Sequence, residues 1–215
     1  MNREKKDMPT IYVRNVSTPD KPITIAPLSF GSPVVPIAGF DELPRTGPAI
    51  LYIVAHAVPD GLRFGKTLIR EEELAKALEY RKGQPTLIIF DACFAKSFSK
   101  IPDFQWPAKF GLIFSCLEHE RTWGSGGESG APLQSLFSSA LDKAINDCLL
   151  RGSFAGLQAA LVAAFGGIQN PFVEASDDLL REVFGINGSQ AALQSPQQQT
   201  IAPQPTAGIS AYDGG

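Results

Sequence analysis

The sequence predicts an α/β fold with a mainly parallel central sheet and helices on both faces, and three observations support this prediction. Residues 51–56 and 86–93 are two apolar, β-rich runs of the kind found in strands that are buried on both faces. The segment between them contains a turn and a helical pattern, which is the crossover that parallel strands require. Strand and helix patterns then alternate along the rest of the chain.

The chain up to residue 56 predicts two strands of this sheet. Residues 10–16 form a first β-rich run, and residues 49–56 form a continuous apolar run that ends in His56. Between them, residues 17–48 are rich in proline. We therefore expect irregular packing there, with at most a short strand at residues 23–25.

A turn, a short strand and a helix are expected next. The Pro-Asp-Gly sequence at 59–61 predicts a turn, and residues 62–65 are expected to return as a short strand. Thr67 is expected to cap a helix whose apolar residues recur at helical spacing and whose first turn is acidic. Gly83 and Pro85 end this helix.

The later chain continues the alternation and finishes in a segment without any pattern. Pro171 places the last of the expected strands at a sheet edge, because proline cannot donate to a ladder. The expected strands cover residues 86–91, 110–115 and 170–173, and the expected helices cover residues 133–149, 154–165 and 177–184. Residues 188–215 are mostly Gln, Pro, Ala, Ser and Gly, which predicts a disordered tail after one domain at 1–187.

Composition restricts the class of protein. With 44% hydrophobic and 19% charged residues and a net charge of −3, the chain is typical of a globular protein without a nucleic-acid surface. It has no apolar run long enough for a membrane helix and no secretory signal. Three cysteines do not suggest a disulfide framework, so we expect a cytoplasmic location.

Two reactive side chains mark the ends of the two central strands. His56 closes the first apolar run and Cys93 closes the second. Because ligands of open α/β sheets bind beyond the carboxyl ends of the strands, an imidazole and a thiol are expected in one crevice. This is the arrangement of a cysteine nucleophile with a histidine acid/base.

Several motifs in this order resemble the caspase-like cysteine peptidases, in particular the bacterial metacaspase type. The resemblance covers roughly residues 49–175. It is carried by the strand ending in His56, the Asp91-Ala-Cys93 sequence, the strand and loop at 113–120, the helix at 133–149 and the Gln-Asn-Pro sequence at 169–171. It implies a caspase-like three-layer sandwich in which residues 1–187 form a peptidase domain.

The resemblance also implies an activity and a set of site residues. Cys93 attacks the scissile carbonyl, His56 protonates the leaving amine, and the backbone N–H groups of Ala57 and Cys93 stabilise the oxyanion. Asp91 corresponds to an acid that contributes to the S1 pocket and to a preference for Arg or Lys, and Glu118 and Glu120 resemble further acids of that pocket. The implied protein is a cysteine endopeptidase acting on protein or peptide substrates. A regulatory partner protein is a further expectation.

Each assignment has a plainer alternative. Cys93 can be a buried structural cysteine and His56 a partly buried histidine that has no role in catalysis. Asp91, Glu118 and Glu120 can simply be solvated at the surface. Cys116 and Cys148 are expected to be packing residues, and His119 a solvated loop residue.

Two departures from the family pattern favour a different class of function. Ala57 stands where the family has Gly after the histidine, and Lys96 stands where Gly is usual after the cysteine. If either position needed φ > 0, a non-glycine residue would strain the site. The alternative is a caspase-like pseudoprotease that binds a partner. A third interpretation is a generic α/β small-molecule-binding domain.

No organic cofactor or metal is implied. With two histidines and no Cys-x-x-Cys, the sequence does not predict a zinc site. Some metacaspases bind calcium through clustered acids, and here only Asp177, Asp178 and scattered loop acids are available. The sequence leaves calcium dependence open.

Overall fold

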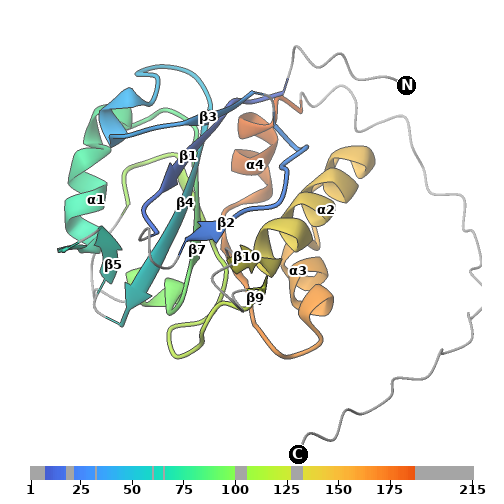
Figure 1. The fold of residues 1–215 in the computed structure, drawn as a ribbon. Helices are drawn as coiled ribbons and strands as arrows, with labels where there is room; N and C mark the ends of the chain where they lie inside the picture. The colour runs from blue at the N-terminus through green and yellow to red at the C-terminus, as the bar shows by residue number, and fades with distance from the viewer. Residues whose placement is uncertain are drawn as a thin grey trace, which may run out of the picture.

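The computed structural model describes residues 8–17, 22–31, 33–59, 61–64, 66–99, 106–126 and 133–186. Six strands lie side by side in the order β11-β8-β7-β4-β1-β3 (Figure 1). Their bounds are β1 (Ile11–Asn15), β3 (Val34–Pro36), β4 (Ala49–Val58), β7 (Thr86–Ala92), β8 (Phe110–Phe114) and β11 (Phe172–Glu174). All neighbours in this order pair in parallel except β11, which runs antiparallel to β8 at one edge.

The two central strands, β4 and β7, are buried along nearly their whole length. All seven residues of β7 are buried, as are the first seven of β4. A strand with helices on both faces has no solvent side, so its sequence is apolar throughout instead of alternating. The polar exceptions Tyr52, Thr86 and Asp91 therefore need partners inside the protein.

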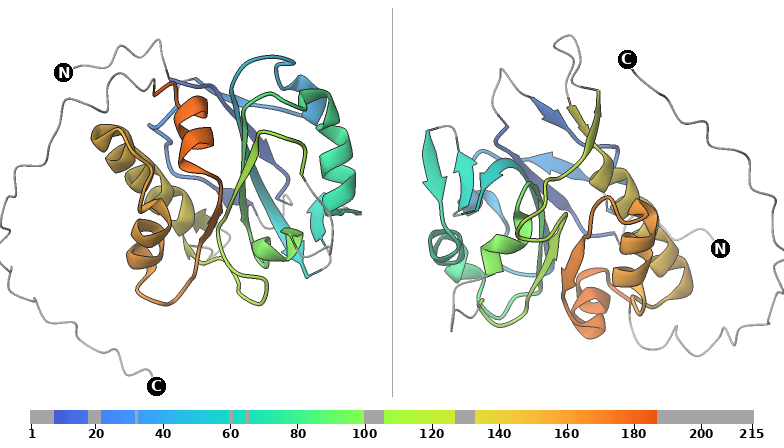
Figure 2. Two further views of the ribbon diagram at one scale, coloured as in Figure 1. Left: turned by 180° about the vertical axis from the view of Figure 1, so that it is seen from behind. Right: turned by 90° about the horizontal axis from the view of Figure 1, so that it is seen from below.

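Helices cover both faces of the sheet, as the sequence predicts. One face carries α2 (Leu136–Arg151), α3 (Leu157–Phe165) and α4 (Asp177–Val183), and the other carries α1 (Glu71–Ala77) (Figure 2). Ile50, Tyr52 and Val54 of β4 pack on the three-helix side. The alternate residues Leu51 and Ile53 pack on the α1 side.

Three segments differ from the sequence-based expectations because they pair as strands. Thr67 does not cap a helix: it begins β6 (Thr67–Ile69), which pairs with β5 (Gly61–Phe64), and β5 extends from β4 as a hairpin. Val34–Pro36, expected to be irregular, forms the outer strand beside β1. The first residues of the expected helix at 133–149 instead form β10 (Leu133–Ser135).

Strand β10 belongs to a small second sheet. It pairs with β2 (Ile23–Thr24) and with β9 (Gly124–Gly126). The Ser135 side chain accepts a hydrogen bond from the Ser138 N–H, so α2 begins directly after this strand. The helix expected at 154–165 begins only at Leu157, because Gly156 has a left-handed conformation (φ 87°) that a helix cannot contain.

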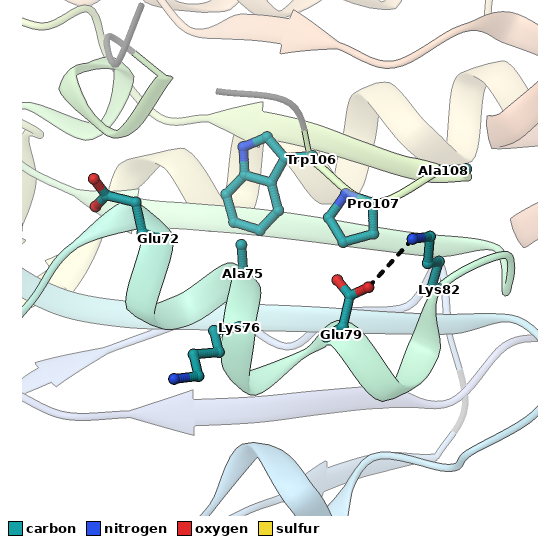
Figure 3. A pocket seen from close by; sticks show the side chains of 8 residues that line it. All are labelled: Glu72, Ala75, Lys76, Glu79, Lys82, Trp106, Pro107 and Ala108. Atoms are coloured by element: carbon teal, nitrogen blue, oxygen red, sulfur yellow. Dashed lines mark ion pairs between the residues drawn. The ribbon is translucent and has the colours of Figure 1, made fainter. Parts of the chain in front are cut away.

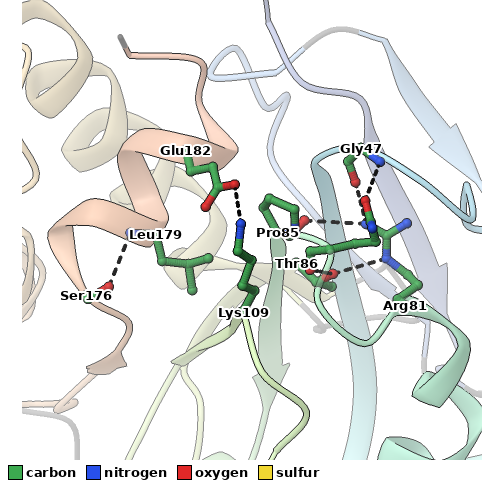
Figure 4. Close-up of polar contacts among 9 residues, drawn as sticks. Gly47, Arg81, Pro85, Thr86, Lys109, Ser176, Leu179 and Glu182 are labelled. Atoms are coloured by element: carbon green, nitrogen blue, oxygen red, sulfur yellow. Dashed lines mark hydrogen bonds and ion pairs between the residues drawn. The ribbon is translucent and has the colours of Figure 1, made fainter. Parts of the chain in front are cut away.

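A buried arginine joins the loop before β4 to the start of β7. Arg81 is 0% exposed and follows α1 in the 3-10 helix η3 (Glu79–Arg81). Its guanidinium donates to the Gly47 carbonyl and to the Thr86 hydroxyl (Figure 4). It also donates to the Pro44 carbonyl. Burial lowers the pKa of Arg81 from its ordinary value.

None of the helices in the described ranges is both long enough and apolar enough to cross a membrane. The tail expected at residues 188–215 lies outside the described residues.

Candidate active site

His56 and Cys93 lie at the same level of adjacent strands. The last residues that pair β4 with β7 are Ala55 and Ala92, and His56 and Cys93 directly follow them. Neighbouring strands lie about 4.8 Å apart, so these two backbone positions are close. Both residues are partly buried. The sheet thus brings together the two residues that the sequence singles out.

The backbone just before Cys93 is held by polar groups from the segment after β8. The carbonyl of Ala92 lies 2.9 Å from the Ser115 Oγ, 2.8 Å from the Thr122 Oγ1 and 3.3 Å from the Cys116 Sγ. Cys116 is fully buried here, and burial raises the pKa of its thiol. Cys116 is therefore a packing residue that contacts the end of β7.

The backbone just after Cys93 is strained and anchored. Phe94 has φ 55°, an uncommon conformation for a bulky residue. Its N–H donates to the Glu120 carbonyl at 2.8 Å, and the Lys96 N–H donates to the Cys116 carbonyl at 3.1 Å. Strained residues persist where their surroundings fix them, and they cluster at functional sites.

Asp91 is buried beside the candidate dyad. It is 2% exposed, and its Oδ2 accepts a hydrogen bond of 2.9 Å from the Tyr52 hydroxyl. Ser135 is a second hydrogen-bonding partner of this carboxylate. Burial raises the pKa of Asp91 to about 6, although both hydrogen bonds act in the opposite direction.

Tyr52 remains protonated at neutral pH and donates to this carboxylate. Burial, and then the charge of Asp91, raise the pKa of Tyr52 well above its ordinary value. Among the described residues, no Lys or Arg forms an ion pair with Asp91. Above pH 6 the site therefore contains a buried negative charge, to which the hydroxyl groups of Tyr52 and Ser135 donate.

Glu120 is held by the chain itself. Its carboxylate accepts hydrogen bonds from the Leu117 N–H, at 3.2 Å, and from the Asn170 N–H and side-chain amide. Burial alone would raise the pKa of Glu120, but these hydrogen bonds outweigh it and the pKa is lowered. Glu118 is partly buried on the same loop, and His119 is exposed. A substrate-binding role remains a prediction for Asp91, Glu118 and Glu120.

The two departures from the family pattern do not strain the backbone. Ala57 lies within β4, where the chain is extended, and neither Ala57 nor Lys96 has a positive φ. Glycine is therefore not required at either position. Next to Cys93, it is Phe94 that adopts the left-handed conformation.

The comparisons with known proteins identify the fold. No protein-family model matches the sequence, and no curated protein matches it. Among solved structures, the crystal structure of caspase-1 from Spodoptera frugiperda matches with a TM-score of 0.52 at 12% sequence identity. The match covers 80% of this chain and 87% of that chain. The fold is caspase-like.

Two cavities on the surface of this caspase-like fold lie away from the dyad. One, of about 520 Å³, is bounded by α1, η3 and the segment at 106–108, with Trp106 and Pro107 on one side and Glu79 and Lys82 on the other (Figure 3). The other, of about 440 Å³, lies between the start of β8 and α4. Neither is lined by His56 or Cys93.

No three His, Cys, Asp or Glu residues of the described ranges are grouped so that they could hold a metal ion. Asp177, one of the acids considered for calcium, accepts a hydrogen bond of 2.8 Å from the Phe154 N–H.

Sequence reasoning missed the partners of Asp91. Tyr52 lies two residues before the position that pairs with Asp91, so its long side chain reaches the carboxylate diagonally. A tyrosine inside an apolar run is a usable signal, because its buried hydroxyl needs a partner. Ser135 carried no such signal, because its approach depends on the pairing of β10.

Proposed function

We propose that this chain is a cysteine endopeptidase in which Cys93 is the nucleophile and His56 the general acid and base. The observation that carries the proposal is the register of β4 and β7, in which the last pair, Ala55 and Ala92, comes directly before His56 and Cys93. The caspase-like fold also supports the proposal, since the strand order and the structural match are properties of the backbone.

The proposed reaction has two halves. The Cys93 thiolate attacks the scissile carbonyl while the backbone N–H groups of Ala57 and Cys93 stabilise the oxyanion. His56 gives a proton to the departing amine, and it then takes one from the water that hydrolyses the thioester. The backbone anchors on Ala92 and Phe94 support this mechanism, since they hold Cys93 from both sides.

We propose further that the substrate carries Arg or Lys at P1. Asp91 is two residues before the nucleophile, is buried and has no cationic partner among the described residues. A basic side chain would supply the missing positive charge, although it would have to compete with Tyr52 and Ser135 for the carboxylate.

The first test concerns the dyad. Cys93→Ala should abolish peptide hydrolysis and leave the melting temperature unchanged, because it removes one partly buried sulfur atom. His56→Ala should lower kcat by about 100-fold or more with little change in KM. The matched controls are Cys148→Ala, a buried thiol in α2, and His119→Ala, an exposed histidine, both with turnover retained. Full activity of Cys93→Ala would refute the assignment.

The second test concerns specificity. Fluorogenic peptides that differ only at P1 should be cleaved after Arg or Lys and not after Asp, because a buried carboxylate repels a second acid. Asp91→Asn should reduce kcat/KM for the basic peptides by about 10-fold or more, while a small thiol reagent still modifies Cys93. Preference for P1 Asp, or an unchanged profile in the variant, would remove Asp91 from the pocket.

A pseudoprotease that only binds a partner predicts another outcome. No peptide would be cleaved, with or without calcium, and a basic peptide electrophile would not label Cys93. The features that favour this alternative in the sequence, Ala57 and Lys96, impose no backbone strain.

A further inference from the structure

The side chain of Lys96 makes contacts that have no role in the proposed mechanism. It belongs to the 3-10 helix η4 (Ala95–Ser99), three residues after Cys93. Its Nζ lies 2.7 Å from the Glu174 Oε2. The same Nζ lies over two aromatic rings, 4.2 Å from the centroid of Phe172 and 5.0 Å from that of Phe114.

These contacts cross from the nucleophile loop to the edge of the sheet. Phe172 and Glu174 belong to β11, the antiparallel edge strand, and Phe114 belongs to β8, its neighbour. The Lys96 side chain is only 18% exposed, so its ammonium is largely removed from water. An ammonium placed over aromatic faces and against a carboxylate is held by two kinds of attraction at once.

The loop that Lys96 ties down contains the strained residue Phe94. A left-handed conformation in a bulky residue persists only while the surrounding contacts fix it. Two of those contacts are the backbone hydrogen bonds to Glu120 and Cys116, and the Lys96 side chain supplies a third anchor on a different element. If this anchor is lost, Phe94 can relax toward a negative φ and Cys93 moves with it.

We propose that Lys96 is a positioning residue for Cys93, which clamps the loop after the nucleophile to strand β11 through Glu174 and Phe172. This inference rests on the proposed function for its kinetic consequence, but the clamp itself is a property of the fold. It also gives a role to the residue that stands where the resembling family has glycine.

The decisive variant is Lys96→Met, which keeps the length of the side chain and removes its charge. We expect kcat to fall about 10-fold or more with KM within about two-fold, because a displaced nucleophile slows the chemical step more than it weakens binding. Lys96→Arg retains the charge and the ring contacts, and should keep kcat within about three-fold of wild type. Glu174→Gln tests the same clamp from the other side.

The chain offers a matched control. Lys109 and Glu182 form a pair with the same 2.7 Å separation, and it lies at the opposite end of β8. Lys109→Met removes a Lys–Glu ion pair of the same length, with a more exposed lysine, without touching the nucleophile loop, so kcat should stay at the wild-type value. Equal kcat values in Lys96→Met and Lys109→Met would overturn the inference.

Hydrogen exchange tests the clamp without relying on catalysis. The amides of Phe94 and Lys96 should exchange about 10-fold faster or more in Lys96→Met and in Glu174→Gln, and at the wild-type rate in Lys109→Met. If the wild-type protein cleaves no peptide, the proposed function fails and exchange alone decides on the clamp. Unchanged exchange in both clamp variants would then overturn it.

Discussion

At the scale of single residues, the buried carboxylate of Asp91 has an energetic cost at neutral pH. Its pKa of about 6 means that the folded protein binds a proton more tightly than the unfolded chain, whose aspartate has a pKa near 3.8. The ionised carboxylate therefore opposes folding at neutral pH. Costly buried charges are characteristic of functional sites, where stability is given up for activity.

This cost predicts how stability depends on pH. As pH rises from 4 to 6, Asp91 should subtract from the free energy of unfolding, by roughly 3 kcal/mol in total for a shift of about two pKa units. Asp91→Asn should remove this loss, so the variant should be more stable than wild type at pH 7 and about equal at pH 4. Urea unfolding of both proteins at pH 4, 5, 6 and 7 measures the difference. A less stable variant at pH 7 would contradict the prediction.

The residues of the candidate site divide into those that sequence could supply and those that it could not. His56 and Cys93 stand at the ends of apolar runs, so their meeting follows from the topology of parallel strands. The strain at Phe94 could not be predicted, because it arises from contacts with Glu120 and Cys116 on another loop. The backbone conformation at positions 57 and 96 was equally hidden from the sequence. Neither residue has a positive φ, so the absence of glycine there has no steric consequence.

At the scale of elements, the guanidinium of Arg81 holds together segments that have little regular structure. The loop before β4 contains Pro44 and Gly47, whose carbonyls both accept from Arg81. A long aliphatic stem and several donors in a fixed plane allow one side chain to satisfy carbonyls from different segments. The start of β4 and the start of β7 are thereby kept in register.

Arg81→Met should destabilise the protein by about 2–4 kcal/mol, because it leaves the partly buried carbonyls of Pro44 and Gly47 and the buried Thr86 hydroxyl without the guanidinium. Urea unfolding provides the measurement. The control is Lys82→Met at the next position, where an exposed lysine pairs with Glu79 at 3.4 Å and the expected change is below about 1 kcal/mol. A similar small change in both variants would show that water replaces the guanidinium without cost.

The boundaries of the elements show what local sequence can and cannot predict. The helix ends at Gly152 and Gly166 both have a positive φ, which glycine adopts without steric cost. The sequence predicts that the helix begins at residue 133, because the apolar spacing at Leu133 fits a helix. In the structure Leu133–Ser135 instead pairs with β2 and β9. Tertiary pairing of this kind overrides local propensity.

At the scale of the whole molecule, the alternation of strands and helices was sufficient to predict three layers. Helices α2, α3 and α4 on one face and α1 on the other match that prediction. The order of the strands was not predictable, because a sequence pattern does not say on which side of β4 the next strand will pair. The resemblance of motifs predicted a caspase-like arrangement, and the structural comparison supports it at the level of the fold.

The composition of the C-terminal segment predicts that it is dispensable for folding. Ile186 is the last described residue, and it is buried in the core on the three-helix face. A chain ending after Gly188 should therefore keep the wild-type melting temperature to within about 2 °C, since the remaining sequence lacks the apolar pattern needed to bury surface. Differential scanning calorimetry of both chains makes the comparison. A large fall would show that the segment packs on the domain.

The two strands at the ends of the β11-to-β3 order, β11 and β3, are poorly suited to pairing with another copy of the molecule. β3 and β11 are three residues long, and a proline lies in or directly before each, at Pro36 and Pro171. A proline has no N–H to offer a neighbouring chain, and a short strand offers few other groups. A sheet with such ends is a poor template for intermolecular growth, which matters for a protein whose central strands are apolar enough to aggregate if they were exposed.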